Sequence, residues 1–115
     1  MKFSAALAFT DPDHYLPLAR ACEDAGFWAV ACSDHVAHPR EISSPYPYSD
    51  DGSPRFPPGT AFVDPLVAMA AMGVVTERLR FFTNIYVLPL RNPLGVAKQL
   101  ASIVSLIGNR IALGI

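Results

Sequence analysis

The chain has 115 residues, 51% of them hydrophobic and 17% charged, with a formal net charge of −1. This length allows one domain at most, and the charge balance gives no sign of a polyanion-binding protein, so we expect no nucleic-acid partner. No segment approaches the roughly 20 apolar residues of a membrane span, so we expect no membrane partner. Cys22 and Cys32 are interpreted as small buried hydrophobic residues, which fits a reducing, cytoplasmic setting.

The first third of the chain alternates between strand and helix patterns. Residues 2–9 and 27–33 are apolar almost throughout, as is typical of strands buried on both faces. Residues 14–25 follow helical spacing, and Gly26 stands where a left-handed residue ends a helix. This part of the chain therefore predicts a β-α-β unit.

Residues 36–63 follow neither period and contain six prolines. Structureless loops beyond about 12–15 residues are uncommon in compact domains and are usually functional lids or disordered segments. The aromatic side chains of Tyr46, Tyr48, Phe56 and Phe62 argue against a solvated linker. We predict an active-site loop that packs over a cleft and contacts substrate through Tyr46 or Tyr48.

The second half of the chain contains two pairs typical of a helix start, Asp64-Pro65 and Asn92-Pro93. They predict helices that extend to residues 76 and 107. The apolar run from Leu79 predicts a buried strand between these helices, and residues 110–115 predict another. The apolar stripe expected on the last helix consists of Leu94, Ala97, Ala101, Val104 and Ile107.

This order predicts an α/β fold with a parallel sheet and right-handed crossovers. A doubly wound sheet and a (β/α)₈ barrel share the pattern. No glycine-rich nucleotide-binding motif follows the first strand, which weakens the nucleotide-fold interpretation. A barrel needs about 250 residues, so the chain has the length of roughly its first half.

Polar residues follow two predicted strands at their carboxyl ends, where such sheets and barrels bind ligands. Asp34-His35 follows one strand, and Thr83 and Asn84 interrupt the other. A carboxylate beside an imidazole can hold or deliver a proton near neutral pH, but a turn-capping Asp beside a surface His has the same sequence. Likewise, the polar side chains of Thr83 and Asn84 could simply form hydrogen bonds with backbone groups at the end of the strand and have no functional role. We expect both pairs at one end of the sheet, lining one cleft.

Two other patterns have weaker interpretations. Arg91 could bind an anionic group or be a solvated side chain after the strand. Cys32, His35 and His38 have a spacing that suggests a metal, but alternation along a strand points Cys32 and His35 to opposite sides. No fourth ligand lies nearby in the sequence, so we predict no metal site.

Several motifs together indicate a family. They are Ser33-Asp34-His35, the loop HPREISSPYPYSDDGSPRFPPGT at 38–60, TERLR at 76–80, TNIYVLPLRNP at 83–93 and RIALG at 110–114. On these motifs the sequence resembles the amino-terminal part of luciferase-like monooxygenases, and the similarity covers nearly the whole chain. The resemblance is greatest to their F420-dependent oxidoreductase branch.

The resemblance implies that residues 1–115 are the amino-terminal half of a TIM-type (β/α)₈ barrel, with a flavin or deazaflavin ring at its carboxyl-terminal mouth. It implies that His35 is the catalytic proton partner and that a non-prolyl cis peptide lies at Asn84-Ile85. The cofactor-binding residues it implies are Asp34, Thr83, Asn84, Ile85 and Tyr86.

The sequence departs from the family pattern in two respects. Relatives usually have Gly where this chain has Phe82, whose ring we expect to crowd the sheet or its neighbours. Relatives also continue past Leu-Gly with a glycine-rich segment and four more strands, which supply the phosphate-binding site.

The function that the resemblance implies is hydride transfer between coenzyme F420 and an unknown organic substrate. An FMN-dependent monooxygenase is the alternative within the family. A non-catalytic half-barrel that acts only through association is the alternative from another class. A sheet open at both edges further predicts a homo-oligomer, such as a dimer, or a complementing chain.

Overall fold

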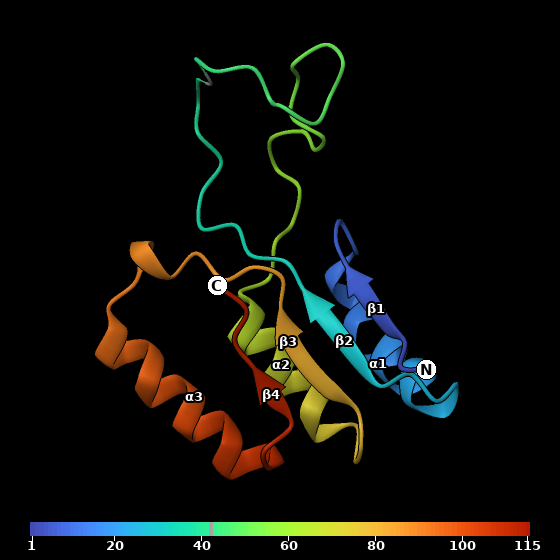
Figure 1. Ribbon diagram of the computed structural model, residues 1–115. Helices are drawn as coiled ribbons and strands as arrows, with labels where there is room; N and C mark the ends of the chain where they lie inside the picture. Colours follow the sequence, from blue (N-terminus) through green and yellow to red (C-terminus); the bar gives the residue numbers. More distant parts are fainter. Residues whose placement is uncertain (42) are drawn as a thin grey trace.

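The computed structural model describes residues 1–41 and 43–115, which form one sheet flanked by helices (Figure 1). The elements in chain order are β1 (Ser4–Leu7), η1 (Pro12–His14), α1 (Tyr15–Asp24), β2 (Ala29–Cys32), α2 (Pro65–Val74), β3 (Arg80–Thr83), η2 (Leu88–Leu90), α3 (Pro93–Ile107) and β4 (Ile111–Ala112). Among these described residues, no helix is both long and apolar enough to cross a membrane.

The four strands are parallel and lie in the order β1-β2-β3-β4, which confirms the predicted parallel α/β sheet. The paired segments are shorter than the apolar runs that predicted them. In β1 only Ser4–Leu7 pairs, because the chain then turns out of the sheet. Phe9 has a φ of 58°, a left-handed conformation that a strand does not accommodate.

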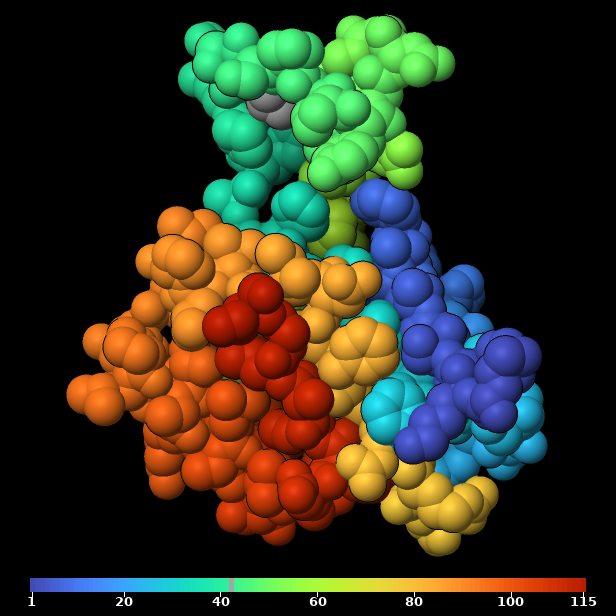
Figure 2. All heavy atoms as spheres, in the orientation of Figure 1, coloured from blue at the N-terminus to red at the C-terminus, as the bar shows by residue number. Residues whose placement is uncertain are grey.

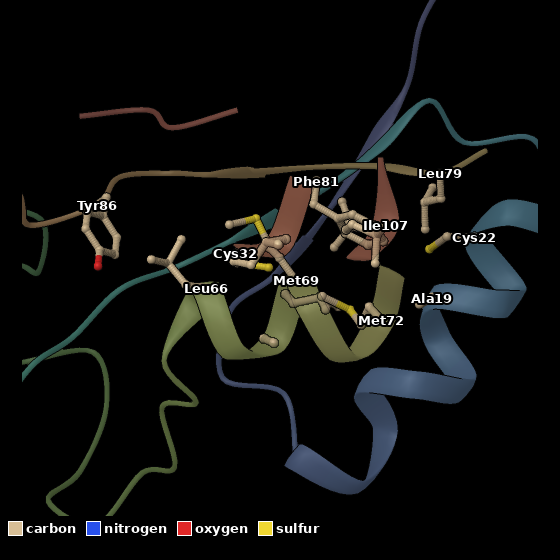
Figure 3. Packing of buried hydrophobic residues seen from close by; sticks show 14 of the residues in the cluster. Ala19, Cys22, Cys32, Leu66, Met69, Met72, Leu79, Phe81, Tyr86 and Ile107 are labelled. Atoms are coloured by element: carbon tan, nitrogen blue, oxygen red, sulfur yellow. The ribbon is translucent and has the colours of Figure 1, made fainter. Parts of the chain in front are cut away.

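One face of the sheet carries the hydrophobic core, in which strand side chains meet those of α2 (Figure 3). Core residues from these elements include Val30, Cys32, Leu66, Met69, Met72 and Phe81. Burial raises the pKa of the Cys32 thiol to about 12, so this cysteine is neutral at physiological pH. Both cysteines are buried as free thiols.

The register places Ala6, Ala31, Phe82 and Ala112 in one row across the sheet. Because side chains alternate along a strand and Phe81 faces the core, this row points to the opposite side. No described helix covers that side (Figure 1). The alanines leave room for the Phe82 ring, which borders a hollow of about 300 Å³ there. The four described strands therefore accommodate Phe82 without the expected crowding of the sheet, and crowding of neighbours beyond them stays a prediction.

Both predicted helix starts are confirmed. The Asp64 carboxylate accepts backbone N–H bonds of 2.9 and 3.3 Å at the start of α2. The Asn92 side-chain oxygen accepts bonds of 3.0 and 3.1 Å at the start of α3. Each cap is followed by proline, which has no N–H to satisfy at this position.

The apolar stripe predicted for α3 is wrong at Leu94, Ala97, Ala101 and Val104, which are exposed, and is right at Ile107. Val96, Ile103 and Ile107 are the buried residues of this helix, whereas Leu94 is 80% exposed. The helix is apolar on more than one side, so its sequence does not reveal which side packs. Contact with α2 decides the orientation, because Gly73 has no Cβ and Ile107 occupies the space beside it.

The long loop at 36–63 contains no helix or strand among its described residues; residue 42 lies outside them. Its tip folds on itself, with Tyr46 N donating to Gly52 O at 2.8 Å and Arg55 Nη2 donating to Tyr48 O at 2.8 Å. The tip extends away from the sheet and forms a lobe above the body (Figures 1 and 2). The prediction that the whole loop packs over a cleft is therefore wrong for the tip.

Two charged side chains join elements at the amino-terminal end of the sheet. The Glu23 carboxylate accepts hydrogen bonds from the backbone N–H groups of residues 77–79, ahead of β3. Arg110 donates to the carbonyl oxygens of Gly73, Leu79 and Ile107. The contacts of Glu23 and Arg110 thus stabilise the amino-terminal end of the sheet. The polar residues predicted to form the site lie at the other end.

Candidate functional site

The carboxyl ends of β2 and β3 lie side by side. Cys32 pairs with Thr83 at the last position of the register, and Asn84 N donates to Cys32 O at 2.9 Å. Asp34 and His35 follow β2 after one residue, Ser33, so they emerge at the same end of the sheet as Asn84. This arrangement confirms the expected common end.

Asp34 is bound by Arg91 through two hydrogen bonds. Arg91 Nη1 donates to Asp34 Oδ2 at 2.6 Å, and Arg91 Nη2 donates to Asp34 Oδ1 at 2.8 Å. The side chains are 1% exposed for Asp34 and 15% exposed for Arg91. The hydrogen-bonded carboxylate raises the pKa of Arg91 above its ordinary value. The sequence suggested that Arg91 binds an anionic group or is solvated, and neither interpretation included Asp34 as an internal partner.

The same pair contacts two further segments. Val87 N donates to Asp34 Oδ2 at 2.8 Å, and Arg91 Nη2 donates to Asp64 Oδ2, at the start of α2, at 3.3 Å. The Arg91 guanidinium carbon also lies 4.1 Å from the centre of the Tyr86 ring, a cation–π contact. Arg91 therefore connects the end of β2, the segment after β3 and the start of α2.

Thr83 and Tyr86 are buried and make internal contacts. Thr83 Oγ1 donates to Gly114 O and accepts from Gly114 N, both at 2.9 Å. Tyr86 N donates to the same carbonyl oxygen at 2.7 Å. These bonds hold the residues after β4 against the end of β3.

Asn84 and Ile85 differ from their neighbours because their side chains are exposed, Ile85 by 56%. The peptide bond between them is cis, as the resemblance implies. The exposed Ile85, two residues after β3, thus provides an apolar surface at the carboxyl-terminal end of the sheet.

His35 lies in a cluster of aromatic rings. Its ring centre is 4.4 Å from that of Phe62 and 4.7 Å from that of Phe56. Phe9, after β1, contacts both phenylalanines, and His38 lies 5.6 Å from Phe56. The flanks of the long loop thus surround His35, which still remains exposed to solvent.

Two hollows adjoin this cluster. One of about 200 Å³ is bordered by His35, His38 and Thr60. The other, of about 310 Å³, is bordered by His35 and Tyr46. Asn84 borders neither, so the single cleft expected from sequence is not found there. Tyr48 packs against Tyr46 at 5.6 Å but is 70% exposed and borders neither hollow.

The residues with metal-ligand spacing do not converge. Cys32 is buried in the core beneath the sheet, whereas His35 is exposed among the loop aromatics. Within residues 1–41 and 43–115, no three His, Cys, Asp or Glu side chains are grouped as a metal would require.

The family model for luciferase-like monooxygenases matches residues 3–115. The chain belongs to this family. Uncharacterized proteins of Mycobacterium tuberculosis and Mycobacterium bovis are 47% identical to the whole chain, which spans 40% of their length. This member of the family therefore spans less than half the length of these relatives.

Two solved structures share the fold. The monooxygenase RslO1 of Streptomyces bottropensis matches 98% of this chain with a TM-score of 0.71 and 23% identity, and 32% of its own length is covered. The oxygenating constituent of 3,6-diketocamphane monooxygenase from Pseudomonas putida, a type II Baeyer–Villiger monooxygenase in complex with FMN, matches the whole chain. Its TM-score is 0.72 at 16% identity, with 29% of its length covered. The sheet of this luciferase-like protein therefore corresponds to part of a TIM-type barrel.

Proposed function

We propose that the chain forms the ring-binding wall of an F420-dependent oxidoreductase that transfers a hydride between the deazaflavin and a small organic substrate. The observation that carries this proposal is the end of β3, where Asn84 and Ile85 are exposed after a buried strand. It lies beside the end of β2, from which His35 emerges.

These residues fit a deazaflavin or flavin ring. Such a ring has apolar faces and a polar edge, and it would be held by a surface that offers both kinds of contact. Ile85 offers exposed hydrocarbon, and the adjacent Asn84 amide can donate and accept hydrogen bonds. The bound cofactor would supply the hydride chemistry, while the protein orients it and excludes water.

His35 is the proposed catalytic residue. An imidazole can hold or deliver a proton near neutral pH, and the edge-on and tilted contacts with Phe56 and Phe62 restrict the orientation of this one. Cofactor contacts by Asp34, Thr83 and Tyr86 stay predictions. The polar atoms of Asp34 and Thr83 already have internal partners, which favours contact through the backbone that they hold.

The hollow between His35 and Tyr46 supports a substrate position between His35 and the tip of the loop at 36–63. We propose that Tyr46 contacts the substrate there and that Tyr48 contributes through its packing on Tyr46. The free thiols of Cys22 and Cys32 support a reducing, cytoplasmic setting. Residues 1–115 would act as one partial barrel domain.

The choice of F420 rests on the sequence motifs, whereas the Pseudomonas putida structure in complex with FMN favours FMN. Titration of the isotope-labelled chain with F420 and with FMN, followed by NMR, tests both. We expect cofactor to shift the signals of His35, Asn84 and Ile85 and to leave those of Arg78 and Asn109, at the opposite end, unchanged. The cofactor with the lower Kd identifies the branch.

A matched pair of variants sharpens this experiment. Ile85→Asp places a charge on the proposed ring surface, whereas Leu106→Asp places one on the 71% exposed Leu106 of α3. The first should abolish the shifts and the second should not. Absence of any shift at about 1 mM of either cofactor, a concentration that reveals even weak complexes, would reject the proposed site. The non-catalytic half-barrel would then be favoured.

A further inference from the structure

We propose that Arg91 is a positioning residue that acts through Asp34 to hold residues 84–87 and His35 in a fixed relation. The consequence for cofactor binding rests on the proposed function, but the positioning itself does not. The observation behind it is the buried Asp34–Arg91 pair, which contacts both sides of the candidate site.

The geometry of the Asp34–Arg91 pair fixes the orientation of the Asp34 carboxylate as well as its distance from the guanidinium. The two parallel hydrogen bonds, of 2.6 and 2.8 Å, align the planar guanidinium with the carboxylate. Arg91 is held in turn by Asp64 at 3.3 Å and by the face of Tyr86. A lysine would keep the charge but lose the fork, so it would not orient the carboxylate in the same way.

Asp34 transmits this orientation to two neighbours. Its Oδ2 accepts from Val87 N at 2.8 Å, two residues beyond Ile85 in the chain. Its backbone continues directly into His35. A displaced Asp34 carboxylate would therefore move the exposed surface at residues 84–85 and the imidazole together.

Stability alone does not account for such a pair, because buried ion pairs are often no more stabilising than apolar side chains of similar size. Arg110 provides the comparison. It is also partly buried and donates to several carbonyl oxygens, but at the amino-terminal end of the sheet. Loss of either arginine should destabilise the fold, and only loss of Arg91 should disturb the candidate site.

The test compares Arg91→Met, Arg91→Lys and Arg110→Met by NMR without cofactor. We expect Arg91→Met to shift the His35 ring Cε1–H signal and the Ile85 methyl signals, with Arg91→Lys giving smaller shifts in the same direction. The methyl signals of Met69 and Met72, in the core, should stay in place. Arg110→Met should leave His35 and Ile85 unchanged while it lowers the urea midpoint.

If Arg91→Met lowers the urea midpoint but moves neither site signal, Arg91 is only a stabilising residue and the proposal fails. If Arg91→Met does not fold, amide hydrogen exchange in the wild-type chain tests the proposal in its place. The Val87 N–H, bonded to Asp34, should exchange far more slowly than the amide of exposed Tyr48, and equal exchange rates would reject the positioning role of the Asp34–Arg91 pair.

Titration with F420 and FMN separates this proposal from the proposed function. If the wild-type chain shows cofactor shifts, Arg91→Met should raise Kd about tenfold or more, equivalent to about 1.4 kcal/mol. If no cofactor binds, the proposed function fails, but the NMR comparison of the variants still tests the positioning role.

Discussion

Asp34 is an ionisable side chain almost entirely withdrawn from water, with 6% of the residue exposed. Desolvation of a carboxylate costs several kcal/mol unless protein partners replace the water. Here the guanidinium of Arg91 and the N–H of Val87 replace it. Such a site is much more sensitive to loss of one partner than to replacement of the whole pair.

Asp34→Asn should therefore destabilise the fold strongly. The change keeps the shape of the side chain but leaves Arg91 without its buried counter-charge. Loss of one partner from a buried pair costs about 3–5 kcal/mol, and the 15% exposure of the Arg91 side chain favours the lower end. Urea unfolding should show this loss, with the exposed Asp24→Asn as a control that stays within about 0.5 kcal/mol. A loss below about 1 kcal/mol for Asp34→Asn would contradict the prediction.

The residues at the strand ends could be placed from sequence, but their contacts could not. Asp34, His35 and Asn84 lie at the predicted end because a parallel sheet brings the carboxyl ends of its strands together. Arg91 is 57 positions from Asp34, and its approach depends on how the segment after β3 folds. No local pattern encodes that distance. The clue available from sequence was Asp34 itself, a charged residue directly after an apolar strand.

At the scale of elements, local signals were predictable and packing faces were not. The N-cap pairs Asp64-Pro65 and Asn92-Pro93 specify helix starts through atoms within three residues, so both were predicted correctly. The buried side of α3 was predicted wrongly because its apolar residues surround much of the helix. Its orientation depends on Gly73, in another helix.

The contact between Gly73 and Ile107 can be tested by Gly73→Ala. The added Cβ would overlap the Ile107 side chain. Overpacking typically costs about 1–3 kcal/mol, which exceeds the gain of up to about 1 kcal/mol from replacing Gly by Ala in a helix. We expect Gly73→Ala to lower the free energy of unfolding in the wild-type chain and to raise it in an Ile107→Ala background.

Urea unfolding of the four proteins in this cycle measures the coupling. A destabilising effect of the same size in both backgrounds would show that Ile107 is not the residue that limits the space.

Glu23 joins α1 to the start of β3 and makes the stability of the fold depend on pH. Partial burial acts to raise the pKa of this carboxyl, but the N–H donors of Arg78, Glu77 and Leu79 outweigh it and the pKa is lowered. A lowered pKa favours folding at pH values above the ordinary glutamate pKa of about 4.3. This contribution is lost as the pH falls through the folded-state value.

Glu23→Gln should therefore be less stable than the wild-type chain near neutral pH, and the difference should shrink between about pH 5 and pH 3. Urea midpoints measured across this pH range give the pH dependence of stability for the wild-type chain and for Glu23→Gln. Glu77→Gln is the control, because the Glu77 side chain is 88% exposed. Parallel curves for wild type and Glu23→Gln would refute this role of the carboxylate.

For the whole molecule, the sheet is the feature that determines behaviour in solution. Within the described residues, no strand pairs with the outer edge of β1 or of β4. The side of the sheet that carries Ala6, Phe82 and Ala112 has no helix over it among these residues. Unpaired strand edges and large exposed apolar patches are rare in soluble monomers.

We therefore expect the 115-residue chain to self-associate through its sheet at micromolar concentration. Burial contributes about 25 cal/mol per Å², so a contact of a few hundred Å² would stabilise the assembly by several kcal/mol. Light scattering with size-exclusion chromatography measures the oligomeric state of the chain. Ala112→Lys places a charge on the uncovered side of the sheet and should shift the chain toward monomer. Val74→Lys is the control, because Val74 is 68% exposed on α2, a helix on the opposite side of the sheet. A folded wild-type monomer would contradict the prediction, and dissociation by Val74→Lys alone would place the contact on the helices.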